Sequence, residues 1–281
     1  MAKNKGSQAF QKLLSEEKSQ NHVYISRYRT KNMSLNKVPP KKRKAILVIS
    51  EHELTRLEYT PDGSDLLLND QVHLLVPSDE SDDSLESKLD VGGLLEEGNL
   101  LIQNPYDISD YVVLNKASST FALAKYLHFT TLCGILGASE VTVEQIEVKT
   151  STGKQVFKGS LNSPHISGNI NAENRVFEEI RNNIKLNSEF DGGEPNIDEA
   201  EAFLQKYQLL NDISMRSLID QRKGKNPIKR REVTLSLSEE SEKNFQAISN
   251  IKVPVYAKLQ TQIEQVKKEK YTFMLTIKVD F

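Results

Sequence analysis

The clearest pattern of apolar and polar residues lies at the C-terminal end of the chain. Every odd position from Tyr271 to Phe281 is apolar, and most of the even positions between them are polar. Alternation with a period of two is typical of a β-strand that buries one face. Residues 253–265 also alternate, and a charged turn at 267–270 separates the two runs. We therefore expect 253–265 and 271–281 to form a long antiparallel hairpin.

The same period of two begins near Glu140 and then changes phase. The apolar residues of 141–148 switch from odd to even positions at Gln145, which is what a β-bulge produces. The sequence 151–154 is typical of a hairpin turn, and 155–161 is expected to form the returning strand. Residues 169–190 fit both a helical and a strand period, so the pattern leaves their structure open.

Helical periodicity predicts one central helix and a pair of shorter ones. The central helix is expected to begin at Ser118 or Ser119. It continues to about Leu136, where Gly137 ends it. This helix is apolar around most of its circumference, which is typical of a helix in the core. A helix pair is expected over 196–221, and both of its helices start at a side chain that can accept a hydrogen bond. These capping side chains belong to Asn196 and Asp212.

Short apolar runs at 45–49, 72–76, 100–102 and 111–114 predict buried strands in the first half of the chain, and Ser50 predicts a helix start. The resulting fold class is α+β. A mainly antiparallel sheet of the C-terminal half packs on the central helix and the helix pair. The predicted organisation is a basic arm over 1–44, a small α/β region over 45–116 and an α+β domain over 117–281. The acidic segment 78–90 is expected to be a mobile loop of the middle region.

The length and the cysteine content narrow the class of protein. The chain has 281 residues, enough for one large or two modest domains, and Cys133 is its only cysteine. An intramolecular disulfide is therefore excluded, and nothing indicates a secreted scaffold. No apolar run follows the N-terminal lysines, as a secretory signal would require. The apolar stretch 121–138 is short for a membrane helix and contains Lys125 and His128. We expect a cytoplasmic protein without a membrane partner.

Charge is unevenly distributed along the chain. Residues 1–44 hold twelve lysines and arginines against two glutamates, which gives this segment a charge of +10. Because the net charge of the whole chain is −2, the remaining residues carry −12. Such a segment favours a polyanionic partner, because its cations displace counterions from phosphates. A second basic cluster lies at 222–231. We predict nucleic-acid contact through 1–44 and name 222–231 as a second candidate. Two tyrosines for stacking and six cations form the predicted site: Tyr24, Arg27, Tyr28, Arg29, Lys41, Lys42, Arg43 and Lys44.

The sequence contains no complete motif for catalysis or for a cofactor. Gly153-Lys154 lacks the preceding glycine of a phosphate-binding loop and is followed by Gln155 rather than Ser or Thr. The five histidines are scattered, so we predict no metal site and no cofactor. Cys133 falls within the apolar helix and is expected to pack in the core.

Two patterns support other functions. Glu147-Val148-Lys149 on a predicted strand, with Asp107 or Asp110 upstream, is the carboxylate and lysine pattern of a Mg²⁺-dependent nuclease of the restriction-endonuclease type. The runs 253–265 and 271–281 are long enough to span a membrane as a pore-forming hairpin.

Packed antiparallel sheets are commoner than membrane-inserting hairpins, and the nuclease motif is short. We therefore predict a non-enzymatic intracellular interaction subunit that binds a protein or nucleic-acid partner or associates with itself. A Mg²⁺-dependent nuclease and a membrane-active effector are the alternatives.

Overall fold

The computed structural model describes most of the chain from Pro39 onward. The described residues are 39–58, 63, 66–67, 69–77, 84–150, 153–158, 180, 182–184, 187–249, 256, 259–261, 263–264 and 272–281. Contacts within the chain define two compact units. The first comprises Met1–Leu100 with Ile251–Gln260, and the second comprises Leu101–Asn250 with Thr261–Phe281.

The first unit is built around a pair of parallel strands, β1 (Ala45–Val48) and β2 (Val72–Leu75), with Ala45 opposite Val72. All four side chains of β1 are fully buried, as expected for a strand that is apolar on both faces. A short 3-10 helix, η2 (Pro40–Lys42), precedes β1, and α2 (Glu51–Glu58) follows it. The Ser50 hydroxyl accepts a hydrogen bond from the Glu53 amide at 3.3 Å, which confirms the predicted helix start.

The first unit also corrects one prediction. Residues 84–90 of the expected acidic loop belong to a helix, α4 (Ser84–Val91), while 78–83 lie outside the described residues. Leu85 and Leu89 explain the helix, because they lie four residues apart and are only 7% and 3% exposed. Two buried side chains at this spacing define an apolar helix face within an otherwise acidic sequence.

Strands β3 (Leu100–Gln103) and β4 (Tyr111–Val113) are antiparallel, with Leu101 opposite Val113. The first unit ends at Leu100, the first residue of β3. All four strands, β1 to β4, coincide with short apolar runs that predicted strands, so burial of apolar side chains accounts for them.

The second unit contains a five-stranded sheet of order β6-β5-β9-β8, in which β7 also pairs with β5. Its strands are β5 (Glu140–Thr150), β6 (Gly153–Lys158), β7 (Asn187–Glu189), β8 (Arg230–Ser236) and β9 (Thr272–Asp280). The pairs β5/β6, β5/β7, β5/β9 and β8/β9 are all antiparallel. The register of β5 against β9 shifts between Val143 and Gln145, which confirms the predicted bulge. The α+β fold class is therefore correct.

Strand β9 carries the alternation seen in the sequence, but its partners differ from the expected ones. It lies between β5 and β8, so both of its edges are already paired. A strand has only two edges, and a hairpin with 253–265 would need one of them. Residues 259–261 and 263–264 are helical instead, so the predicted hairpin is wrong there, and most of 253–258 lies outside the described residues.

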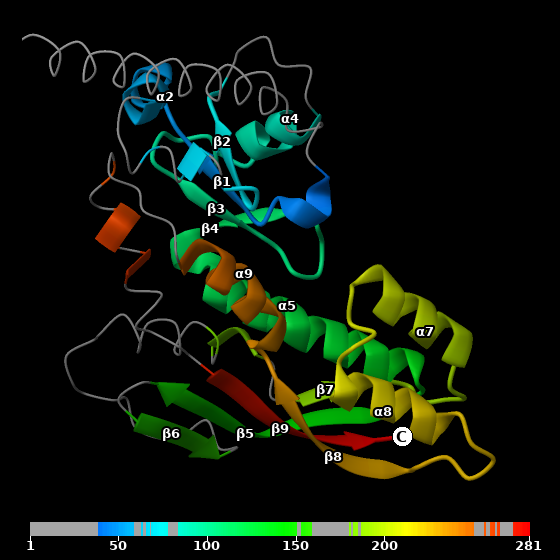
Figure 1. Ribbon diagram of the computed structural model, residues 1–281. Helices are drawn as coiled ribbons and strands as arrows, with labels where there is room; N and C mark the ends of the chain where they lie inside the picture. The colour runs from blue at the N-terminus through cyan, green and yellow to red at the C-terminus, as the bar shows by residue number, and fades with distance from the viewer. Residues whose placement is uncertain are drawn as a thin grey trace, which may run out of the picture. The chain divides into compact units, whose positions relative to one another are not determined.

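The second unit also contains the helices α5 (Leu114–Ile135), α7 (Ile197–Lys206), α8 (Ile213–Arg222) and α9 (Glu239–Ser249). Helix α5 runs along the five-stranded sheet, with α9 beside its first part and α7 beside its last part (Figure 1). It begins at Leu114, earlier than predicted, because Leu114, Ala117 and Phe121 already form a buried helical stripe.

The end of α5 was predicted correctly, and the structure supplies the reason. Gly137 has a φ of +79°, a conformation that favours glycine, and an added Cβ would lie 2.1 Å from the carbonyl oxygen of Gly193. The predicted caps of the helix pair are also confirmed. Asn196 accepts from the Glu199 amide at 3.2 Å, and Asp212 accepts from the Met215 amide at 2.8 Å.

Candidate functional site

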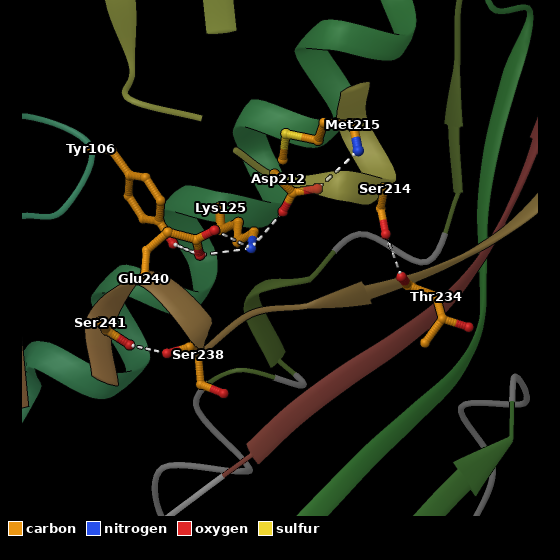
Figure 2. A network of polar contacts seen from close by, with 9 residues as sticks. All are labelled: Tyr106, Lys125, Asp212, Ser214, Met215, Thr234, Ser238, Glu240 and Ser241. Atoms are coloured by element: carbon orange, nitrogen blue, oxygen red, sulfur yellow. Dashed lines mark hydrogen bonds and ion pairs between the residues drawn. The ribbon is translucent and has the colours of Figure 1, made fainter. Parts of the chain in front are cut away.

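A buried lysine at the centre of α5 is the most unusual chemical feature of the second unit. Lys125 is fully buried, and its ammonium group lies between two carboxylates (Figure 2). Its Nζ is 2.7 Å from Asp212 Oδ2, and it lies 2.6 and 2.8 Å from Glu240 Oε2 and Oε1. A buried charge is tolerated only when it is paired and hydrogen-bonded, and this lysine meets both conditions.

The two carboxylates come from the starts of two helices. Asp212 uses its other oxygen, Oδ1, to cap α8 by accepting from the Met215 amide. Glu240 lies in the first turn of α9, where the helix dipole also favours a negative charge. One lysine of α5 therefore fixes the starting points of both helices.

Tyr106, in the connection between β3 and β4, extends this network. Its hydroxyl donates to Glu240 Oε2 at 3.4 Å, and the side chain is 1% exposed. Burial raises the pKa of Tyr106 above its ordinary value, and the negative charge of Glu240 adds to this rise. The phenol therefore stays protonated and acts as a donor.

This geometry limits what the network can do chemically. Lys125 has three donors, and the two carboxylates around its Nζ supply acceptors at hydrogen-bonding distance. An enclosed ammonium group held in this way is not available to attack a substrate. One cation against two carboxylates leaves one excess negative charge, and Glu240 is the most accessible member, with 18% of its side chain exposed. The network is suited to holding α5, α8 and α9 together.

A group of aromatic rings surrounds His128, one turn further along α5. The imidazole lies 4.1 Å from the Tyr207 ring, 5.4 Å from the Tyr106 ring and 5.8 Å from the Phe203 ring, measured between centroids. Burial lowers the pKa of His128 to about 4, and the nearby cation Lys206 contributes to the decrease. The imidazole is therefore neutral near pH 7.

The structure describes only part of the predicted nucleic-acid site. Tyr24, Arg27, Tyr28 and Arg29 lie outside the described residues. Among the other four, Lys41 and Lys42 are exposed in η2, whereas Arg43 is only 4% exposed and Lys44 is half-buried. Arg43 is thus shielded from solvent, close to the buried strand β1 that begins two residues later.

The second basic cluster, 222–231, is largely used within the fold. Arg222 is buried and donates to the carbonyl oxygens of Leu136 at 3.0 Å and Ile228 at 2.8 Å. Arg230 pairs with Asp280. Arg231 donates to Ser217 at 2.8 Å and to Gln221 at 2.7 Å. Lysines 225 and 229 of this cluster are exposed.

The residues of the nuclease pattern are not gathered into a metal site. Glu147 lies on β5 opposite Met274. Asp107 accepts from the amide and hydroxyl of Ser109, and Asp110 accepts from the Asn104 amide nitrogen at 2.9 Å. Within the part of the chain that the structure describes, no group of three or more His, Cys, Asp or Glu side chains is placed to hold a metal ion.

Cys133 is fully buried in α5, as the apolar helix predicted. Burial raises the pKa of its thiol above the ordinary range, so the reactive thiolate form is disfavoured. This residue therefore serves core packing.

Sequence reasoning missed the Lys125 network. The signal was a lysine within a helix that is apolar on most sides, because such a position forces a charge into the core. Its partners could not be found in the same way, since they belong to other helices far along the chain. Glu240 is 115 residues away.

Comparison with known proteins gives no relative: no family model, no curated protein and no solved structure matches this chain. Among the helices that the structure describes, none is both long and apolar enough to cross a membrane.

Proposed function

We propose that this chain is a non-enzymatic binding protein that contacts nucleic acid through its basic N-terminal segment, residues 1–44. The observation that carries this proposal is the contrast between the two basic clusters. Residues 1–44 have a charge of +10, and Lys41 and Lys42 are exposed at the described end of this segment. The arginines of 222–231 instead bond to groups of the same chain.

The composition of the segment fits single-stranded nucleic acid in particular. Lysine and arginine contact phosphates and release counterions, which makes the affinity depend on salt. Tyr24 and Tyr28 supply rings on which bases stack without regard to sequence. Cations and aromatic rings alternate closely between Tyr24 and Arg29, as a segment that follows a flexible strand would require.

The state of the other reactive groups supports binding rather than catalysis. Lys125 is enclosed by its two carboxylates, Cys133 is buried, and the carboxylates of Asp107 and Asp110 accept bonds from neighbouring residues. Each of these groups has a structural role that accounts for its position.

Fluorescence anisotropy with a labelled single-stranded DNA of about 30 nucleotides tests the proposal. The wild-type chain should bind, and the logarithm of its affinity should fall linearly with the logarithm of salt concentration. Lys41→Gln/Lys42→Gln should reduce the magnitude of that slope by about 1.4, because each lost phosphate contact on a single strand contributes about 0.7. Arg27→Gln/Arg29→Gln should have a similar effect.

Lys225→Gln/Lys229→Gln is the matched control, since it removes the same charge from two exposed lysines of the second cluster. An equal reduction of the salt slope in this control and in Lys41→Gln/Lys42→Gln would mean that the whole surface contributes to binding without a defined site. Absence of binding by the wild-type chain at about 50 mM salt would contradict the proposal. Shortening of the DNA in Mg²⁺ would instead favour the nuclease function.

A further inference from the structure

His128 is held by side chains from two other parts of the second unit. Tyr106 reaches it from the β3–β4 connection, while Phe203 and Tyr207 reach it from α7 and from the residue that ends this helix. These three rings cover the imidazole with apolar surface. They supply no carboxylate that could compensate a positive charge on it.

Charged groups of both signs lie near this cluster. Lys206 is a cation, and its Nζ lies 4.9 Å from the centre of the Tyr207 ring. The Lys125 network begins one turn earlier on α5 and carries one excess negative charge, but its carboxylates Asp212 and Glu240 are bonded to Lys125. Burial and the charge of Lys206 are what oppose a proton on His128.

Helix α7 supplies two rings of this cluster, Phe203 and, at its C-terminal cap, Tyr207, and it also buries Ala200 and Leu204. It contacts α5 and α8, and it lies on the outside of the second unit (Figure 1). The segment before it contains Gly192 and Gly193 with φ of +72° and +152°. Such conformations favour glycine, so these two residues set the direction in which the chain enters α7.

We propose that His128 is an acid-sensitive latch that holds α7 on α5, and that protonation of its imidazole releases α7 while the sheet stays folded. The neutral ring packs between Tyr106 and the two rings of α7. The charged ring needs water, and it obtains water when α7 opens.

The direction and size of the effect follow from proton linkage. The lowered pKa of His128, about 4, applies to the closed form, whereas an opened form has the ordinary value of about 6.5. The open form therefore takes up the proton first as the pH falls below 6.5, and the increase in the opening equilibrium levels off below about pH 4. Between pH 7 and pH 5 the opening equilibrium of α7 should increase about 20-fold.

Hydrogen exchange of the full chain, followed by mass spectrometry at pH 7 and pH 5 and corrected for intrinsic exchange rates, tests this latch. We expect protection in 197–206 to fall about 20-fold while protection in β9 is unchanged. His128→Phe keeps a ring in the cluster without a titrating group, so its α7 should show no such fall. His52→Gln is the control, because the side chain of His52 is 84% exposed on α2.

Three results would overturn the latch: equal protection of wild-type α7 at both pH values, the same fall in His128→Phe, or an equal loss in β9, which would indicate global unfolding. Lys206→Gln gives an independent measurement if His128→Phe does not fold. Removing this cation should raise the pKa of His128 in an NMR titration and reduce the fall in α7 protection. An unchanged titration together with an unchanged fall would also contradict the proposal.

Discussion

Replacing Lys125 by methionine tests whether one buried cation holds three helices of the second unit together. Methionine has a similar length and fills the same space, so the main change is the loss of the charge and of its hydrogen bonds. The variant leaves Asp212 and Glu240 facing each other without a cation between them. Both are buried or largely so, with 4% and 18% of their side chains exposed.

The expected cost follows from this uncompensated charge. Removing one partner of a buried ion pair destabilises a protein by about 3–5 kcal/mol. Glu240 retains the hydroxyl of Tyr106 and Asp212 retains the amide of Met215, so neither carboxylate loses every partner. We therefore expect about 3 kcal/mol, the lower end of that range. Against a total stability of about 5–15 kcal/mol, this is a large fraction.

Urea unfolding followed by circular dichroism at pH 7 measures the loss as a shift of the midpoint at an unchanged slope. Lys116→Met is the matched control, because Lys116 is an exposed lysine of the same helix. Its loss should change the unfolding free energy by less than about 0.5 kcal/mol. The triple variant Lys125→Met/Asp212→Asn/Glu240→Gln removes all three charges, and it should recover about half of the lost stability, since no unpaired charge remains.

Two results would refute the reasoning. A cost for Lys125→Met no larger than that of Lys116→Met would show that the network contributes nothing to folding. A triple variant less stable than Lys125→Met would show that the two charged carboxylates stabilise the fold even without the lysine. This would contradict the argument that they are destabilising when unpaired.

Three further predictions concern single positions of the second unit and one matched position of the first. Gly137→Ala should lower the free energy of unfolding in urea clearly more than Gly93→Ala does. Both glycines have positive φ, but only at Gly137 would the new Cβ meet a carbonyl oxygen, whereas a Cβ at Gly93 would have no atom within 4 Å. Cys133 should react with a thiol reagent only at the rate of unfolding, and fast labelling of the native protein would contradict its burial. Ile277→Asp should unfold the protein, because it places a carboxylate in a fully buried position, whereas Thr276→Asp on the other face of β9 should remain folded by circular dichroism.

The sequence predicted most strands because burial of one face leaves a period of two that needs no knowledge of the rest of the chain. Strand β9 and the bulge in β5 are the best examples, since both could be located from parity alone. The partner of β9 could not be located in this way. Alternation is the same for every strand with one buried face, so it does not say which edges meet. The chosen partner, 253–265, was merely the nearest amphipathic segment.

In two helices, packing outweighs the structure that the local sequence indicates. Acidic composition indicated a loop at 78–90, but two leucines four residues apart are enough to attach α4 to the core. Serines at 118 and 119 indicated the start of α5, yet the helix begins at Leu114 directly after β4, and its N-terminal residue has no side-chain cap. Buried apolar contacts outweigh a cap, which is worth only about 1 kcal/mol.

The two basic clusters explain why the candidate site was harder to predict than the fold. Both are rich in lysine and arginine, so both were candidates from the sequence, with 1–44 preferred for its larger charge and its tyrosines. In 222–231 the arginines have hydrogen-bonding or ion-pair partners at the ends of α5, α8 and β9. The Cζ atom of Arg222 also lies 4.4 Å from the centroid of the Phe281 ring. Lys41 and Lys42 extend from a short exposed helix.

Charges that serve folding and charges that serve binding therefore respond differently to removal. Neutralising Arg222 takes away a cation that bonds to two backbone carbonyls, so its loss should lower stability whatever the protein binds. Neutralising Lys41 and Lys42 should leave the unfolding free energy nearly unchanged, because exposed charges contribute little to it. A loss of affinity without a loss of stability is thus what distinguishes a binding cation from a structural one, and no count of charges along the sequence can make that distinction.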